Sequence, residues 1–243
     1  MEEYAKNARE RKIDEIGFSD HINLLRVGDY DVSPLHLFPT YVENFRAFKE
    51  KSDLPVKLGV EIDFFPQAVD DIKRFVSKYP FDYVTGSVHF IGDWMVDWRK
   101  QIEEYQKRDL MQIYEQYFRL VRQLCHSEVF DNLGHPDLIK IFGYRPTRDY
   151  SHILAETAEA VADAGMSVEI NTSGLRRPCM EIYPSERFLR LLHDCAVPIV
   201  FGSDAHEPSD AGRDLSQAVQ LAKKAGYCQV CVYSGRRREA MSI

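Results

Sequence analysis

Short runs of apolar and β-branched residues recur along the chain, and they predict strands. The predicted strands span residues 13–18, 56–62, 82–88, 129–133, 167–171, 198–202 and 229–233. Between them, apolar residues recur at the spacing of one helix face, most clearly from Leu110 to Leu124. Because strands alternate with helices, we predict a parallel sheet covered by helices, which is either a barrel or a doubly wound sheet.

Polar clusters that contain His, Asp or Glu lie at the ends of five of these apolar runs. The clusters are Ser19-Asp20-His21, Gly59-Val60-Glu61, Gly86-Ser87-Val88-His89, Gly134-His135-Pro136-Asp137 and Ser203-Asp204-Ala205-His206. A doubly wound sheet concentrates its site at one switch point, whereas a barrel brings all its strand ends to one mouth. The distribution of the clusters therefore favours an α/β fold of the barrel type.

These clusters predict a metal site with several ligands. A single histidine is most simply a structural residue, but four of the eight histidines lie at strand ends beside carboxylates. Glu61 ends a run too apolar to hold a charge without a partner. Asp204 and His206 are two residues apart as the chain leaves a strand, so their side chains can point to the same side. The predicted metal ligands are His21, Glu61, His89, His135, Asp204 and His206.

The mixture of imidazole and carboxylate ligands indicates the metal and the chemistry. Such ligands suit Zn²⁺, Mn²⁺ or Fe²⁺ and do not suit Ca²⁺, and more than four of them imply more than one ion. Closely spaced ions lower the pKa of a bridging water to roughly 7 and clamp the oxygens of a phosphate ester. Amide hydrolysis would use similar ions.

An arginine at the mouth would favour a phosphate substrate, because its planar fork matches two phosphate oxygens. Arg176 and Arg177 follow the strand that ends at Asn171, so both are placed for this role. The competing interpretation is a solvated loop charge, and it is stronger for Arg177 than for Arg176.

Length and composition narrow the class of protein. The 243 residues suit a single domain, 1–243, near the usual size of a βα barrel. The net charge of −7 (31 basic against 38 acidic residues) argues against nucleic acid as a partner. We see no signal peptide and no apolar run long enough to span a membrane, and the five cysteines form no framework. We therefore predict a cytoplasmic enzyme for a small molecule; the sequence does not indicate its oligomeric state.

The ordered series of clusters resembles the PHP (polymerase and histidinol phosphatase) family over almost the whole chain. The segments 169–176 and 181–185 are similar to the histidinol-phosphatase branch in particular. This resemblance implies a distorted (β/α)7 barrel of the TIM-like type that holds up to three divalent ions. It also implies hydrolysis of L-histidinol phosphate to L-histidinol and phosphate, a late step in histidine biosynthesis.

The resemblance also implies roles for individual residues. Glu61 would bridge two ions, and His89 with His135 would complete the coordination of one of them. Asp204 would bind another ion, and His21 with His206 would hold the third. Arg176 would hold the substrate phosphate, and Asp204 and His206 would be the catalytic residues.

The chain departs from the family at its start. The family opens with a strand that ends in His-x-His, whereas here Met1 directly precedes a predicted helix over residues 2–12. A start assigned too late, a shortened chain and a naturally degenerate member are the three explanations, of which we favour the first two. We expect two sheet edges to be unpaired, with impaired stability and low or no activity.

Three other interpretations remain open. The first is a PHP phosphoesterase for another small phosphate ester, which substrate profiling would distinguish. The second is a non-catalytic metal- or ligand-binding barrel, which would bind metal tightly without phosphatase activity. The third is a doubly wound fold with scattered surface histidines, whose stability would be insensitive to chelators.

Overall fold

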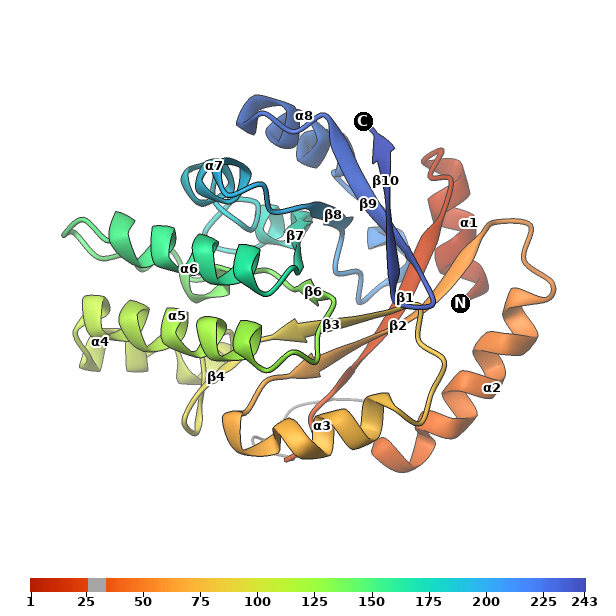
Figure 1. The fold of residues 1–243 in the computed structure, drawn as a ribbon, viewed down its shortest axis with the longest axis horizontal. Helices are drawn as coiled ribbons and strands as arrows, with labels where there is room; N and C mark the ends of the chain where they lie inside the picture. The colour runs from red at the N-terminus through yellow and green to blue at the C-terminus, as the bar shows by residue number, and fades with distance from the viewer. Residues whose placement is uncertain (26–33) are drawn as a thin grey trace.

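Six strands form one parallel sheet in the computed structural model, which describes residues 1–25 and 34–243. In spatial order they are β1 (Ile16–Ile22), β2 (Val56–Asp63), β3 (Tyr83–Ser87), β6 (Asn132–Leu133), β7 (Ser167–Asn171) and β8 (Ile199–Gly202). The spatial order repeats the chain order, so the described sheet has no reversal of the kind that defines a doubly wound fold. The sheet curls on itself (Figure 1), which confirms the prediction of a distorted barrel-like α/β fold.

The helices lie around the outer side of the curled sheet (Figure 1). They are α1 (Glu2–Glu10), α2 (Phe38–Lys49), α3 (Val69–Val76), α4 (Glu104–Lys107), α5 (Leu110–His126), α6 (Ser151–Asp163), α7 (Glu186–Asp194) and α8 (Leu215–Ala225). Helix α5 forms because Asp109 caps its first turn, and its buried residues share one face, as Ile113, Tyr117 and Val121 do. Among the described helices, none is both long and apolar enough to cross a membrane.

Successive side chains of β2 point in turn to the apolar core and to the interior of the barrel. Its even-numbered residues, from Val56 to Ile62, are buried among apolar side chains, whereas Lys57 and Glu61 line a cavity of about 1120 Å³. Gly59 belongs to the residues on the cavity side, and a side chain does not fit there because the ring of Tyr83 lies against it. A Cβ atom at Gly59 would lie 2.2 Å from that ring.

Several strands differ from the sequence prediction, β1 and the predicted strand at 229–233 among them. Strand β1 extends to Ile22, so His21 lies inside the strand rather than after it. The predicted strand at 229–233 exists as β9 (Gln229–Ser234), but it pairs antiparallel with β10 (Arg237–Ser242) instead of joining the parallel sheet. Its two-residue turn has φ angles of +54° and +65°, as the twist of a tight hairpin requires.

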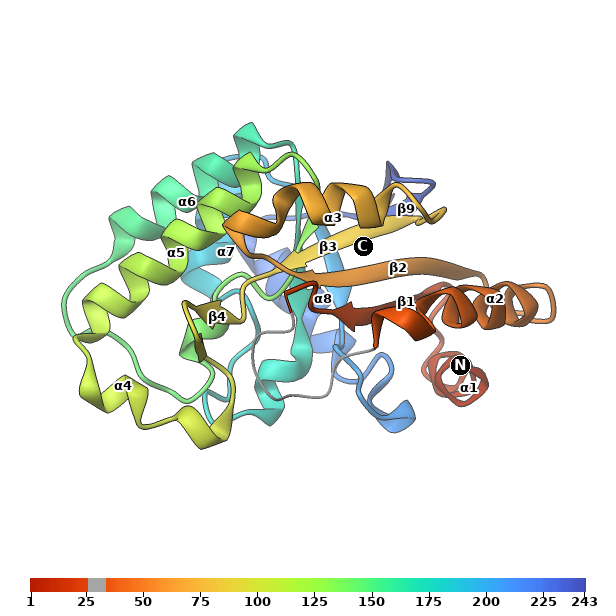
Figure 2. The same ribbon diagram turned by 90° about the horizontal axis from the view of Figure 1, so that it is seen from below.

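The sheet remains open between β1 and β8, which are its two outer strands. Within the described residues no strand lies between them, and the cavity reaches both, through residues such as Phe18 and Phe201. This agrees with the expectation of two unpaired sheet edges. A small hairpin of β4 (Phe90–Ile91) and β5 (Trp94–Met95) lies beyond the end toward which β1 points (Figure 2).

Candidate metal centre

Strand register brings three of the polar side chains together. In the parallel pair of β1 and β2, His21 lies directly opposite Glu61. Asp63 is two residues beyond Glu61 on the same strand, so it projects to the same face of the sheet. His89 follows β3, which neighbours β2 on the side opposite β1. Its ring therefore reaches Asp63 from the side opposite His21.

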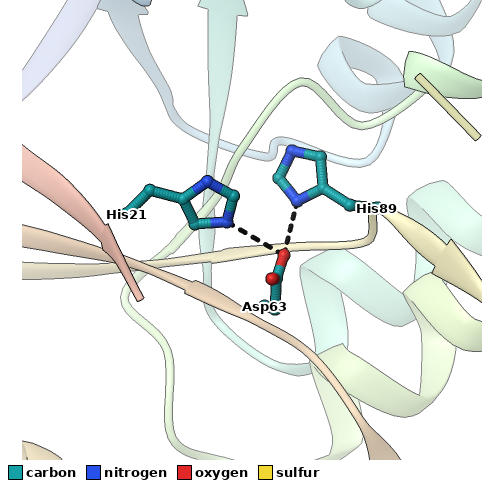
Figure 3. Close-up of side chains that lie close together, drawn as sticks. All are labelled: His21, Asp63 and His89. Atoms are coloured by element: carbon teal, nitrogen blue, oxygen red, sulfur yellow. Dashed lines mark hydrogen bonds and ion pairs between the residues drawn. The ribbon is translucent and has the colours of Figure 1, made fainter. Parts of the chain in front are cut away.

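His21, Asp63 and His89 form the first cluster of possible ligands (Figure 3). The Nε2 atom of His21 lies 3.0 Å from Oδ1 of Asp63, and Nδ1 of His89 lies 2.6 Å from the same oxygen. Asp63 is only 1% exposed. A buried carboxylate between two imidazoles thus has partners that offset the loss of hydration.

Glu61, His89 and His135 form the second cluster. Oε1 of Glu61 lies 3.1 Å from Nε2 of His135 and 3.9 Å from Nε2 of His89. In each cluster the possible ligand atoms all lie within 4.8 Å of one another. His89 faces Asp63 with one ring nitrogen and Glu61 with the other, so it links the two clusters.

The carboxylates control the protonation of these histidines in the absence of metal. Burial is the largest single effect on His21 and lowers its pKa, but the charge and hydrogen bond of Asp63 together with the charges of Glu61 and Asp97 raise that pKa to about 9. Burial is also the largest single effect on His135 and lowers its pKa, but the hydrogen bond and charge of Glu61 together with the charges of Asp204 and Glu169 raise that pKa to about 10. In return, the histidines lower the pKa values of Glu61 and Asp63 against the effect of burial. The site therefore keeps its carboxylates ionised.

This donor set fits divalent ions. Imidazole nitrogens and carboxylate oxygens are ligands for Zn²⁺, Mn²⁺ and Fe²⁺. A ligating histidine commonly donates its second N–H to a carboxylate, which fixes the orientation of the ring. Asp63 lies where it can accept this hydrogen bond from Nδ1 of His89, leaving Nε2 facing Glu61.

The two remaining predicted ligands, Asp204 and His206, line the same cavity but lie outside both clusters. Asp204 accepts a hydrogen bond of 3.1 Å from Oγ of Ser173, and its charge contributes to the raised pKa of His135. The side chain of His206 is 74% exposed. The structure therefore brings all six predicted ligands to one cavity, and four of them into the clusters.

Arg176 holds the loop that carries Asp204. Its Nη2 atom donates to the carbonyl oxygen of Ser203 at 2.8 Å, and its Nη1 atom lies 3.4 Å from a carboxylate oxygen of Asp214. The exposed residue Arg177 is among the described residues that line the cavity, whereas Arg176 is not.

Sequence reasoning missed two acidic residues at this site. Asp63 could have been found from the period of two along its strand, because it shares a face with Glu61. Glu169 of β7 accepts hydrogen bonds from the backbone N–H of His135 at 3.2 Å and from the side chain of Asn171 at 2.9 Å. Burial raises the pKa of Glu169 to about 7. Its place beside His135 follows from the pairing of β6 with β7, in which Leu133 lies opposite Val168, and the sequence carries no local signal for this register.

Comparisons with known proteins agree with this geometry. The sequence profile of the PHP domain matches residues 1–173. A probable histidinol-phosphatase of Deinococcus radiodurans is 34% identical over 231 residues, which cover 92% of this chain and 86% of that protein. A histidinol-phosphatase of Bacillus subtilis is 26% identical over 243 residues, which cover 87% of this chain and 89% of that protein.

A solved structure is similar over almost the whole fold. The histidinol phosphate phosphatase of Lactococcus lactis, crystallised with zinc, L-histidinol and phosphate, superposes with a TM-score of 0.82 at 25% identity. The superposition covers 98% of this chain and 92% of that one. Together with the ordered ligand clusters, these matches show that the chain belongs to the PHP domain family.

Proposed function

We propose that this chain is a metal-dependent phosphomonoesterase that hydrolyses L-histidinol phosphate to L-histidinol and phosphate, a step of histidine biosynthesis. The observation that carries the proposal is the pair of linked clusters around Glu61 and Asp63 in the interior of the barrel. The Lactococcus relative, which binds zinc, L-histidinol and phosphate, supports the choice of substrate.

The residues of the clusters would hold the ions, and Asp63 would orient His89 through its Nδ1 atom. When bound, divalent ions lower the pKa of water and withdraw charge from phosphate oxygens. Asp204 and His206, at the rim of the same cavity, are proposed to complete the metal coordination and to hold or transfer a proton at the reacting phosphate. The ions would be Zn²⁺, Mn²⁺ or Fe²⁺, up to three in number.

We propose Arg176 as the residue that binds the substrate phosphate. Its guanidinium group lies against the loop of Ser203 and Asp204, and its side chain is 17% exposed. A planar guanidinium can satisfy phosphate oxygens with two parallel N–H bonds, which a lysine cannot do. Arg177, which lines the cavity, is the competing residue for this role.

The domain organisation and the cellular compartment of the enzyme are also proposals. We propose that residues 1–243 act as one domain in the cytoplasm. All five cysteines are free in the structure, in keeping with a reducing compartment.

Substrate profiling tests the proposed activity. Phosphate release would be measured from L-histidinol phosphate and from a panel of other small phosphate esters, each with Zn²⁺, Mn²⁺ or Fe²⁺. We expect the largest kcat/KM for L-histidinol phosphate. A larger kcat/KM for another ester would instead assign the chain to a different phosphoesterase activity.

A non-catalytic metal-binding barrel is the second candidate function. It is favoured by the position of Asp204 and His206 outside the two clusters. Tight metal binding without release of phosphate from any ester would support this candidate and exclude the first.

A further inference from the structure

Lys140 is a buried cation that the proposed reaction does not use. Its side chain is 3% exposed, and its Nζ atom contacts three acceptors. These are the carbonyl oxygen of Ile182 at 2.8 Å, Oδ2 of Asp137 at 2.9 Å and Oε2 of Glu181 at 3.1 Å. The three N–H bonds of the ammonium group are therefore all matched.

Stability alone does not account for this arrangement. Replacing a buried ion pair with apolar side chains of similar volume is often neutral or stabilising, so such a pair is weak evidence for stability. A buried pair does fix one geometry, because a displaced partner would leave a charge unpaired in the interior. The function of Lys140 is therefore to be sought in the segments whose positions it fixes.

Lys140 joins two segments that converge on His135. Asp137 lies two residues after His135, and its Oδ2 atom also accepts a hydrogen bond of 2.8 Å from the backbone N–H of Ser185. Ile182 precedes Tyr183, whose ring packs edge-on against the ring of His135 at 6.3 Å between centroids. The Nζ atom of Lys140 lies 5.2 Å from the centre of the same tyrosine ring.

The position of His135 depends on contacts outside the strand ladder, because the strand that precedes it is very short. The strand before it, β6, has only two residues, Asn132 and Leu133. His135 itself has a φ angle of +22°, a conformation that a residue with a side chain rarely adopts. Its Nδ1 atom is buried and has no hydrogen-bond partner within the described residues, so no bond at that nitrogen fixes the ring.

We propose that Lys140 is a positioning residue for the metal centre, which acts through Asp137 and Tyr183 to orient His135 toward Glu61. This inference rests on the proposed metal site, but its test does not depend on the phosphatase activity. Groups that orient a metal ligand typically contribute about 10–100-fold to metal affinity.

The test compares the metal affinity of variants by titrating metal-free protein with Zn²⁺. The main variant is Lys140→Met combined with Asp137→Asn, which removes both buried charges and leaves neither unpaired. The control is Arg122→Met, which removes a half-buried cation that bonds Thr157 at 3.1 Å between α5 and α6 and does not line the cavity of the clusters.

We expect Zn²⁺ to bind the double variant about 10–100-fold more weakly, with an altered visible spectrum of the Co²⁺-loaded protein. The control should keep the affinity and spectrum of the unaltered chain. Glu181→Gln, which changes a partly exposed partner of Lys140, should weaken binding in the same direction but less. Unchanged Zn²⁺ affinity and Co²⁺ spectrum in both Lys140-network variants would overturn the proposal, whatever the phosphatase activity.

Discussion

Single residues determine the chemistry of this site, and the shared carboxylate of Asp63 is the clearest case. It lies between His21 and His89, which come from segments 68 residues apart (89 − 21). Against the opposing effect of burial, the charge of Asp63 is the main contribution that raises the pKa of His21 to about 9 in the absence of metal. The side chain of Asp63 therefore contacts both imidazole rings and fixes their orientation.

The raised pKa values predict how the metal-free protein responds to pH. The pKa values of His21 and His135 are about 9 and about 10, against about 6.5 for an unfolded histidine. The folded state thus binds these protons more tightly, and the resulting stability is complete below about pH 6.5 and is lost as the pH rises through 9 to 10. We expect the Tm of the chelated protein to fall between pH 7 and pH 10. A Tm that rises between pH 7 and pH 10 would contradict the raised pKa values of His21 and His135.

Asp63→Asn tests whether the carboxylate supports metal binding, either as a ligand or by orienting His89. The amide keeps the shape of the side chain but removes the charge that faces both histidines. We expect the affinity for Zn²⁺ to fall by about 10–100-fold, as for other partners of ligating histidines. Calorimetric titration measures this, and Asp194→Asn, at an exposed position, is the matched control. Equal Zn²⁺ affinities of the two variants would exclude both roles of Asp63 at the metal site.

Exchanging each of the two arginines for lysine tests which one binds phosphate. Lysine keeps the charge but loses the fork that matches two oxygens. We expect Arg176→Lys to lower kcat/KM for L-histidinol phosphate by about 10-fold or more, since a charged hydrogen bond is worth about 1.5–3 kcal/mol. Arg177→Lys should change it little. The reverse order would assign the phosphate to Arg177.

At this scale the sequence predicted most of the site. His21, Glu61, His89 and His135 were found because each belongs to a short polar cluster that interrupts an apolar pattern. Asp204 and His206 reach the same cavity, and their predicted metal-ligand and catalytic roles stay predictions. The contact of Glu169 with His135 arises from the register between the neighbouring strands β6 and β7, which no local pattern encodes.

At the scale of elements, strand register controls which ligands meet. Because β1 and β2 are parallel and in register from Ile16 with Val56, His21 lies beside Glu61. A shift of one residue would turn these ligands to the opposite face. Apolar runs predicted the strands well, whereas β10 was missed because all its residues are exposed and no alternation marks them.

The packing of Tyr83 over Gly59 predicts a stability effect at this scale. Gly59→Ala would place a methyl group into the ring, so we expect it to lower the free energy of unfolding by about 1–3 kcal/mol. Chemical denaturation measures the change. In a Tyr83→Ala background the same substitution should cost much less, because the ring is gone. An equal cost in both backgrounds would show that the contact is not the cause.

At the scale of the whole molecule, the curled sheet gathers residues from 21 to 206 around one cavity while its outer strands stay apart. The alternation of strands and helices predicted a parallel sheet covered by helices, and the distribution of the polar clusters over several strand ends favoured this barrel-like order. Strands β1 and β8 are unpaired edges of the described sheet, and the predicted ligands Asp204 and His206, which follow β8, lie outside both clusters of possible ligands. We therefore expect metal-dependent turnover below the ordinary range of about 1–10³ s⁻¹.

Phosphate release from L-histidinol phosphate is the measurement that tests the central claim most directly. It would be made on the chain loaded with Zn²⁺ or Mn²⁺, beside Glu61→Gln, Asp204→Ala and the control Arg122→Met. The account predicts slow release that a chelator stops, that both acidic variants abolish and that the control retains. Bound metal without any chelator-sensitive release, or release that survives in Glu61→Gln, would contradict it.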